Sequence, residues 1–202
     1  MKHRRQAGYS LPEMLTVVAI VGVLALVTVP AFINFYQAGK MKASMRNFTT
    51  DLRSIRQRAI TRGHQTVLTY DVTASGAAEA NYKRTYYFYE GNLPFNSTTW
   101  KPVALKESGT TAAQHTLNDV IYFPNDAAGT PQTFADTLTC TGATCTAGTD
   151  NRPEIMFFPD GRVRVPSGNT VGEVTIKTNK KITIRQYTID ISPSGSVKAI
   201  AQ

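Results

Sequence analysis

The pattern of apolar and polar positions divides the chain into three regions. The first, residues 14–33, is a run of twenty uncharged and mostly apolar residues. As an α-helix, a run of this length extends for about 30 Å, which matches the hydrocarbon thickness of a bilayer. We therefore predict that it crosses a membrane once. Pro30 removes one backbone donor near the end of the run, so we also expect a kink or a soft turn there.

The second region, residues 34–64, has the period of an amphipathic helix. Its apolar residues are spaced alternately four and three positions apart, as expected for one face of an α-helix. They are Met41, Met45, Phe48, Leu52, Ile55 and Ala59. Gly63 is a typical stop signal for a helix. The pattern predicts an anchor followed by a helix whose apolar face packs against a sheet.

The third region, residues 65–202, has the composition of strands. Seven runs are rich in β-branched and aromatic residues: 66–72, 84–89, 120–123, 155–158, 162–165, 174–177 and 182–191. Pro159-Asp160-Gly161 and Pro193-Ser194-Gly195 are tight-turn sequences between hairpin partners. Residues 104–150 are poor in aromatic residues, and we expect long surface loops there. The whole pattern predicts an α+β fold with one antiparallel β domain after the helix.

The formal net charge of +8 is unevenly distributed along the chain. Residues 34–64 hold seven basic residues against one acidic residue, Asp51, whereas residues 65–202 hold twelve of each sign. The basic excess therefore lies on the helical stem and in the first eight residues, and the β domain is neutral. A basic stem could contact nucleic acid, an acidic surface or anionic lipid headgroups at the membrane exit.

Cys140 and Cys145 are the only cysteines in the sequence. Outside the cytoplasm, two cysteines so close together are expected to form a small-loop disulfide. Closing so short a loop constrains little of the unfolded chain, so we expect it to fix local shape. A metal or redox site would need further soft ligands or a CxxC spacing, and neither is present. We predict no metal site.

Glu13 lies just inside the start of the apolar run, after a basic octapeptide that ends in Gly8. An ionised side chain in hydrocarbon costs about 2.5 to 3.5 kcal/mol even on the gentlest insertion scale, so this carboxylate indicates a function and requires a partner. The basic residues before Gly8 place the amino-terminal side in the cytoplasm and everything after Asn34 on the other side of the membrane.

Two simpler interpretations of the amino-terminal end compete with a functional Glu13. A secretory signal peptide is cut after small residues that follow its apolar region, and residues 27–32 match that pattern poorly. A plain single-span anchor explains neither Gly8 nor Glu13.

The residues around Gly8, Tyr9 and Glu13 resemble the processing site of type IV pilins and type II secretion pseudopilins. The resemblance implies that a prepilin peptidase cuts after Gly8 and methylates the new terminus at Tyr9, which leaves Glu13 four residues further on. Pro30 fills the place of a proline that the family has late in its apolar helix. Two departures are mild: the mature chain more often begins with Phe in this family, and Pro12 replaces a commoner aliphatic residue.

The same resemblance implies a ladle-shaped molecule with one long helix, about Leu11 to Arg62. Residues 1–8 would be the leader, residues 9–33 the transmembrane and assembly helix, and residues 34–64 the amphipathic helix. Residues 65–202 would form a periplasmic antiparallel β domain, attached to the inner membrane by the single span.

A second set of motifs resembles the GspH/FimT subfamily of minor pseudopilins and minor pilins. These motifs are the basic helix end at residues 53–60, the Phe-Phe-Pro-Asp-Gly segment at 157–161 and the final hairpin at 187–197. Residues 82–150 match nothing in this pattern, so their loops are expected to be peculiar to this chain.

Some members of that subfamily bind DNA through a Gly-Arg-x-Arg motif near the carboxyl terminus. Gly161-Arg162-Val163-Arg164 has these letters but lies ahead of the last hairpin, and Gly195-Ser196-Val197-Lys198 lacks the first arginine. Arg162 and Arg164 would project together from one strand and could hold phosphates. The alternative is an exposed strand face after a turn, which the neutral charge of the β domain favours.

The resemblance implies assembly as the function of this chain. Its partners would be the prepilin peptidase, other pilins or pseudopilins and an inner-membrane assembly platform. Glu13 of one subunit would pair with the amino group of Tyr9 of a neighbour, and the low dielectric would strengthen that pair. The product would be a type IV pilus or a type II secretion filament; the alternative is a minor pilin that binds DNA for natural transformation.

Nothing in the sequence favours catalysis. His64 and His115 are the only histidines after residue 8, and neither is part of a known metal or hydrolase motif. We expect each of them at the surface or at a helix end. The sequence predicts no enzyme activity and no cofactor.

Overall fold

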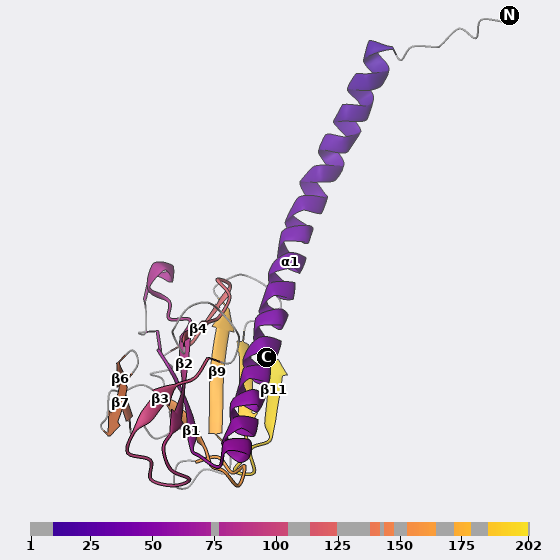
Figure 1. The fold of residues 1–202 in the computed structure, drawn as a ribbon. Helices are drawn as coiled ribbons and strands as arrows, with labels where there is room; N and C mark the ends of the chain where they lie inside the picture. Colours follow the sequence, from indigo (N-terminus) through magenta and orange to yellow (C-terminus); the bar gives the residue numbers. More distant parts are fainter. Residues whose placement is uncertain are drawn as a thin grey trace, which may run out of the picture.

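A single helix of 52 residues, α1 (Leu11–Arg62), carries the rest of the chain along its carboxyl-terminal half (Figure 1). The computed structural model describes residues 10–73, 77–104, 114–124, 138–141, 144–147, 153–164, 172–178 and 186–201. Gly63 ends the helix in the left-handed conformation, with φ of 70°, and its N–H donates to the carbonyl of Ala59 at 2.9 Å. Glycine adopts this backbone without steric cost, which is why the predicted stop signal acts at this position.

The described strands form three antiparallel sheets. A five-stranded sheet has the order β3-β2-β1-β8, with β4 also paired to β2; a four-stranded sheet has the order β11-β10-β9-β5; β6 and β7 form a hairpin of their own. The elements are β1 (Thr66–Tyr70), the 3-10 helix η1 (Glu79–Asn81), β2 (Thr85–Gly91), β3 (Trp100–Pro102), β4 (Gln114–Thr116), β5 (Ile121–Tyr122), β6 (Leu138–Thr141), β7 (Thr144–Ala147), β8 (Glu154–Phe157), β9 (Gly172–Thr178), β10 (Gln186–Ile191) and β11 (Val197–Ala201).

The core lies between the second half of α1 and the two larger sheets. All six residues of the predicted apolar face are buried, from Met41 to Ala59. Phe48 is at the centre of this face, and its ring meets Tyr86 edge-on at 5.0 Å and Phe123 at 5.7 Å between centroids. Burial of each large apolar side chain contributes about 1.5 to 3 kcal/mol, so this stripe is what attaches the β domain to the helix.

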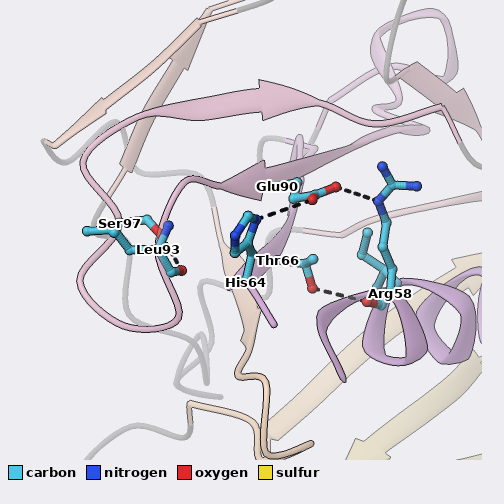
Figure 2. A network of polar contacts seen from close by, with 7 residues as sticks. Arg58, His64, Thr66, Glu90, Leu93 and Ser97 are labelled. Atoms are coloured by element: carbon cyan, nitrogen blue, oxygen red, sulfur yellow. Dashed lines mark hydrogen bonds and ion pairs between the residues drawn. The ribbon is translucent and has the colours of Figure 1, made fainter. Parts of the chain in front are cut away.

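Polar contacts fasten the last turns of α1 to the first sheet (Figure 2). Arg58 Nε donates to Glu90 Oε2 on β2 at 2.6 Å, and His64 Nδ1 lies 3.5 Å from the other oxygen of the same carboxylate. At the same end, the hydroxyl of Thr66 donates to the carbonyl of Ile55 at 3.1 Å. These contacts fix the direction in which the chain leaves the helix and enters β1.

The α+β prediction is confirmed, and the strand predictions are confirmed for most of the runs. Two differences have physical reasons. The run 162–165 is no strand in its described part, residues 162–164: Val163 forms one isolated bridge with Phe157, through bonds from the N–H of Phe158 to the carbonyl of Arg162 and from the N–H of Arg164 to the carbonyl of Met156. The N–H of Val163 points the other way and donates to the carbonyl of Pro193. Of the run 182–191, residues 182–185 lie outside the described part.

The second difference concerns residues 104–150, where we predicted long surface loops besides the strand run 120–123. Their described parts contain β5, which that run predicted, and also β4 and the β6–β7 hairpin, which were not predicted. The sequence also missed β3, which ends at Pro102. The strands that were not predicted are three or four residues long and mostly polar or ended by proline, as is typical of edge positions, so they show little of the alternation that identifies a strand.

Candidate functional site

The amino-terminal half of α1 projects beyond the β domain and packs against none of the described residues (Figure 1). Residues 10–36 are all exposed, and Leu26 and Phe35 each retain 77 % of their surface. A soluble monomer rarely exposes so large an apolar surface, and such a surface marks contact with a membrane or with other proteins. This half of the helix is long and apolar enough to cross a bilayer.

The two threonine hydroxyls within this half are satisfied by the helix itself. Thr16 donates its hydroxyl to the carbonyl of Pro12 at 2.9 Å, and Thr28 donates to the carbonyl of Leu24 at 2.8 Å. Backbone carbonyls accept these bonds without interrupting the helix. The helix therefore presents no unpaired hydroxyl at these positions to a hydrocarbon environment.

Glu13 is the only charged residue between residues 10 and 39. It lies in the first turn of α1, where its N–H donates to the carbonyl of Ser10 at 3.1 Å. Its side chain is exposed, and no described residue donates to its carboxylate. The partial positive charge of the helix start favours an anion there but does not replace a full counter-charge. Gly8 and Tyr9 lie outside the described residues, so the cut and the pairing remain predictions.

Pro30 lies inside α1, and the helix continues through it as one element. Proline lacks the N–H that would bond the preceding turn, so Pro30, unlike Pro12 in the first turn, removes a backbone hydrogen bond from the interior of the helix. The predicted soft turn stays a prediction.

Arg56 joins the three segments that resemble the GspH/FimT pattern. Its Nε donates to the carbonyl of Gly161 at 3.0 Å, and its Nη2 donates to the carbonyl of Ser194 at 2.8 Å. Gly161 and Gly195 have φ of 81° and 80°, so both turns use the left-handed backbone that their glycines permit. The sequence placed Arg56 in a motif but gave no sign of this bridging role.

Arg162 and Arg164 are exposed on either side of buried Val163, as expected for one strand face. Arg162 Nε lies 2.6 Å from Asp160 Oδ2, and the two form an ion pair at the tip of the turn. The backbone N–H of Arg162, and then its side chain, hold the pKa of the Asp160 carboxyl below its ordinary value. Part of the positive charge that a phosphate would need is therefore already neutralised.

A second carboxylate of α1, Asp51, is buried in the core with only 4 % of its surface exposed. Tyr86 donates its hydroxyl to Asp51 Oδ2 at 2.8 Å, and His115 Nδ1 lies 3.7 Å from the same oxygen. Burial raises the pKa of Tyr86 far above its ordinary value, and the charge of Asp51 raises it further. His64 follows the helix end as predicted, but the surface prediction for His115 is wrong, because β4 holds its ring against Tyr86 and Phe88.

Cys140 and Cys145 are directly opposite each other in the β6–β7 hairpin. Opposite residues of an antiparallel pair have Cα atoms about 4.5 or 5.5 Å apart, and a disulfide spans both distances. The backbone thus supports the predicted disulfide, which stays a prediction. Within the described ranges no group of three histidine, cysteine or acidic residues could hold a metal ion.

Comparison with known proteins matches two family models to this chain. The model described as Type II transport protein GspH matches residues 44–195, and the prokaryotic N-terminal methylation motif matches residues 3–29. Comparison with curated protein sequences found no match.

Among solved structures, the chain is similar to two of the minor pseudopilin EpsH from the type II secretion system of Vibrio cholerae. One has 13 % identity and a TM-score of 0.47 over 80 % of this chain and 97 % of the other. The second has 13 % identity and a TM-score of 0.45 over 81 % and 97 %. Because the GspH model covers well over half of the sequence, the chain belongs to the GspH family of type II transport proteins.

Proposed function

We propose that this protein is a minor pseudopilin or minor pilin, a filament subunit that assembles through the exposed half of α1. The single observation that carries the proposal is that half itself, apolar on all sides and without charge except for Glu13. A helix that is apolar all round needs lipid or other helices on every side. Membrane anchoring before assembly and a helical bundle in the filament would each satisfy this need.

The processing steps follow from the methylation motif at residues 3–29. A prepilin peptidase would remove residues 1–8, and the new amino terminus at Tyr9 would be methylated. The β domain would then lie in the periplasm, held to the inner membrane by residues 9–33. The mature chain should begin with an N-methylated Tyr9 in mass spectrometry, and a product that retains its first eight residues would contradict this.

In the filament, Glu13 would pair with the terminal ammonium of Tyr9 on a neighbouring subunit. The carboxylate has no donor within the described part of its own chain, so an intermolecular partner is the simplest source of a counter-charge. Two opposite charges attract strongly at low dielectric, and either one alone is costly there. A subunit that is out of register would bury both charges unpaired, so the pair would select the register.

Replacement of Glu13 tests the proposal. Glu13→Ala and Glu13→Gln should still insert and still be cut after Gly8, but should be recovered in filaments at less than about a tenth of the normal level, since an unpaired buried charge costs several kcal/mol. Glu13→Asp keeps the charge and serves as the matched control, with at least partial recovery expected. Normal incorporation of Glu13→Gln into filaments would reject the pairing.

DNA binding by Arg162 and Arg164 is not proposed. Arg162 is paired with Asp160, and the β domain that carries both arginines is neutral as a whole. These observations support an exposed strand face after a turn.

A further inference from the structure

One flank of α1 carries three cations that no described carboxylate neutralises. Lys42, Arg46 and Arg53 are exposed, and none of them forms an ion pair with a described residue. The one acidic residue on this half of the helix, Asp51, is buried and accepts from Tyr86 instead. This part of the basic excess of the stem is therefore displayed on the surface.

A groove of about 700 Å³ runs between this flank and strand β11. Met45 and Val197 are buried along it, so the groove combines apolar contacts with the three cations. Lys198 also lines the groove, but it lies opposite the acidic Asp190 in the β10–β11 register, so the three cations of the helix supply the net positive charge of the groove.

Strand β11 is the last strand of its sheet. Its partner is β10, and its outer edge forms no backbone hydrogen bond with any other described residue. Such an edge is a template for an additional strand. A bound peptide that adds to an edge gains main-chain hydrogen bonds, and the pockets for its alternate side chains give specificity.

The dimensions of the flank and of the edge agree. From Lys42 to Arg53 the helix rises about 17 Å, and the five residues of β11 extend for about 17 Å. Lys42 and Arg46 are separated by about 6 Å along the helix axis, and alternate residues of a strand by about 6.8 Å. Two alternate side chains of a strand added to β11 would therefore meet Lys42 and Arg46. Arg53 lies about 10.5 Å beyond Arg46 along the axis, and its long side chain would meet a carboxylate further along the strand.

We propose that this groove binds an extended acidic segment of a partner protein. The segment adds to the outer edge of β11 and directs carboxylates at alternate positions toward Lys42, Arg46 and Arg53. Charge complementarity selects an acidic partner, and the free backbone edge selects a polypeptide over a nucleic acid.

A lipid surface does not fit the whole groove. Arg53 lies about 25 Å along the helix beyond Tyr36, the last residue of the fully exposed apolar half. The headgroup layer of a bilayer is only about 5 to 7 Å thick on each side, so Arg53 is out of its reach. The inference concerns a surface of the β domain and stem, and it holds whether or not Glu13 guides assembly.

The test uses the full-length protein in nanodiscs of uncharged lipid. The probe is a labelled peptide that alternates Glu and Val, and the control peptide has the same composition with the Glu residues in one block. The protein variant carries Lys42→Glu, Arg46→Glu and Arg53→Glu. Its matched control carries Arg62→Glu, Lys83→Glu and Lys101→Glu, which are equally exposed basic residues outside the groove. Fluorescence anisotropy gives the affinities, and hydrogen exchange reports on β11.

The alternating peptide should bind more tightly than the block peptide and should slow amide exchange in β11. Reversal of the three groove charges should weaken binding by about tenfold or more, because three surface pairs are lost and replaced by repulsion. The control variant should change the affinity by less than about twofold. An equal loss of affinity in both protein variants would show only a general attraction between opposite charges and would overturn the proposal. Equal binding of the two peptides without slower amide exchange in β11 would overturn it as well. Tighter binding of duplex DNA with the same dependence on the three cations would overturn it in favour of a nucleic-acid site.

Discussion

The two halves of α1 use the same backbone and have opposite surroundings. Phe35 in the first half is 77 % exposed, whereas Phe48, little more than three turns later, is completely buried. The difference comes from the pattern of side chains. A helix that is apolar on every side cannot be satisfied by one sheet, whereas a helix with a single apolar stripe needs only one. The sequence thus assigns the second half to the chain's own β domain and leaves the first half for other molecules.

The two acidic residues of α1 show the same contrast. Asp51 obtains a hydrogen-bond donor, Tyr86, from within the chain. Glu13 obtains none from the described residues. A buried carboxylate without a partner is costly wherever it occurs, so in the proposed assembly the first half of the helix would obtain from a neighbour what the second half obtains by folding.

The largest expected effect comes from truncating the same residue type in each half. Phe48→Ala should lower the free energy of unfolding of the β domain by about 3 to 5 kcal/mol, because it leaves a cavity beside Tyr86 and Phe123. Phe35→Ala is the matched control and should leave that free energy unchanged within about 0.5 kcal/mol. Urea unfolding of the full-length protein in detergent micelles measures both values.

Trp100 is a suitable reporter for that measurement. It is the only tryptophan of the chain and is buried in the β domain, so its fluorescence follows this domain alone. If Phe35→Ala destabilised the β domain as much as Phe48→Ala, the two halves of the helix would be energetically coupled and the contrast between them would fail.

A smaller effect is expected at the contact between Arg56, in the second half of α1, and the turns at Gly161 and Gly195. Gly195→Ala should cost about 2 to 4 kcal/mol, because alanine is strained at positive φ and its Cβ would overlap Arg56 and the carbonyl oxygen of Gly161. Gly63→Ala has almost the same φ but open space around it, so it should cost only about 1 to 2 kcal/mol. The same urea unfolding gives both values. Equal losses of unfolding free energy in the two variants would show that backbone strain alone sets the cost, and that the overlap with Arg56 adds nothing to it.

The helix could be predicted because its signals are local. The stop at Gly63 and the alternating spacing of Met41 to Ala59 are each visible within a few residues of sequence, and the structure confirms both. The tight turns at Gly161 and Gly195 were likewise predicted from three residues each.

What the sequence did not reveal depends on contacts between distant segments. Arg56 meets residues that lie 105 and 138 positions away, and Asp51 meets Tyr86 across 35 positions. No local pattern encodes which strand will bring a donor to a buried acid. The predicted surface position of His115 failed for the same reason, since a three-residue polar strand gives no sign of what will cover it.

The smallest effect concerns pH and two buried tyrosines of the β domain. Burial raises the pKa of Tyr86 and that of Tyr70 well above the ordinary value, which is about 10. Below a pH of about 10, both the folded and the unfolded chain keep the protons of the two tyrosine hydroxyls, so these groups cause no loss of stability there. At higher pH the unfolded chain releases protons that the folded domain retains. Stability should therefore fall as pH rises, by about 1.4 kcal/mol per pH unit for each tyrosine.

Tyr86→Phe should make the fall in stability with rising pH less steep, by about 1.4 kcal/mol per pH unit, which is the contribution of one tyrosine. It should also lower the stability at neutral pH by about 1 to 3 kcal/mol, because buried Asp51 loses its donor. Tyr36→Phe, in the exposed half of the helix, is the matched control and should leave both quantities unchanged. Urea unfolding at several pH values between 8 and about 11 gives the slopes. A decline as steep in Tyr86→Phe as in the parent chain would mean that Tyr86 does not retain its proton on folding, and would contradict the prediction.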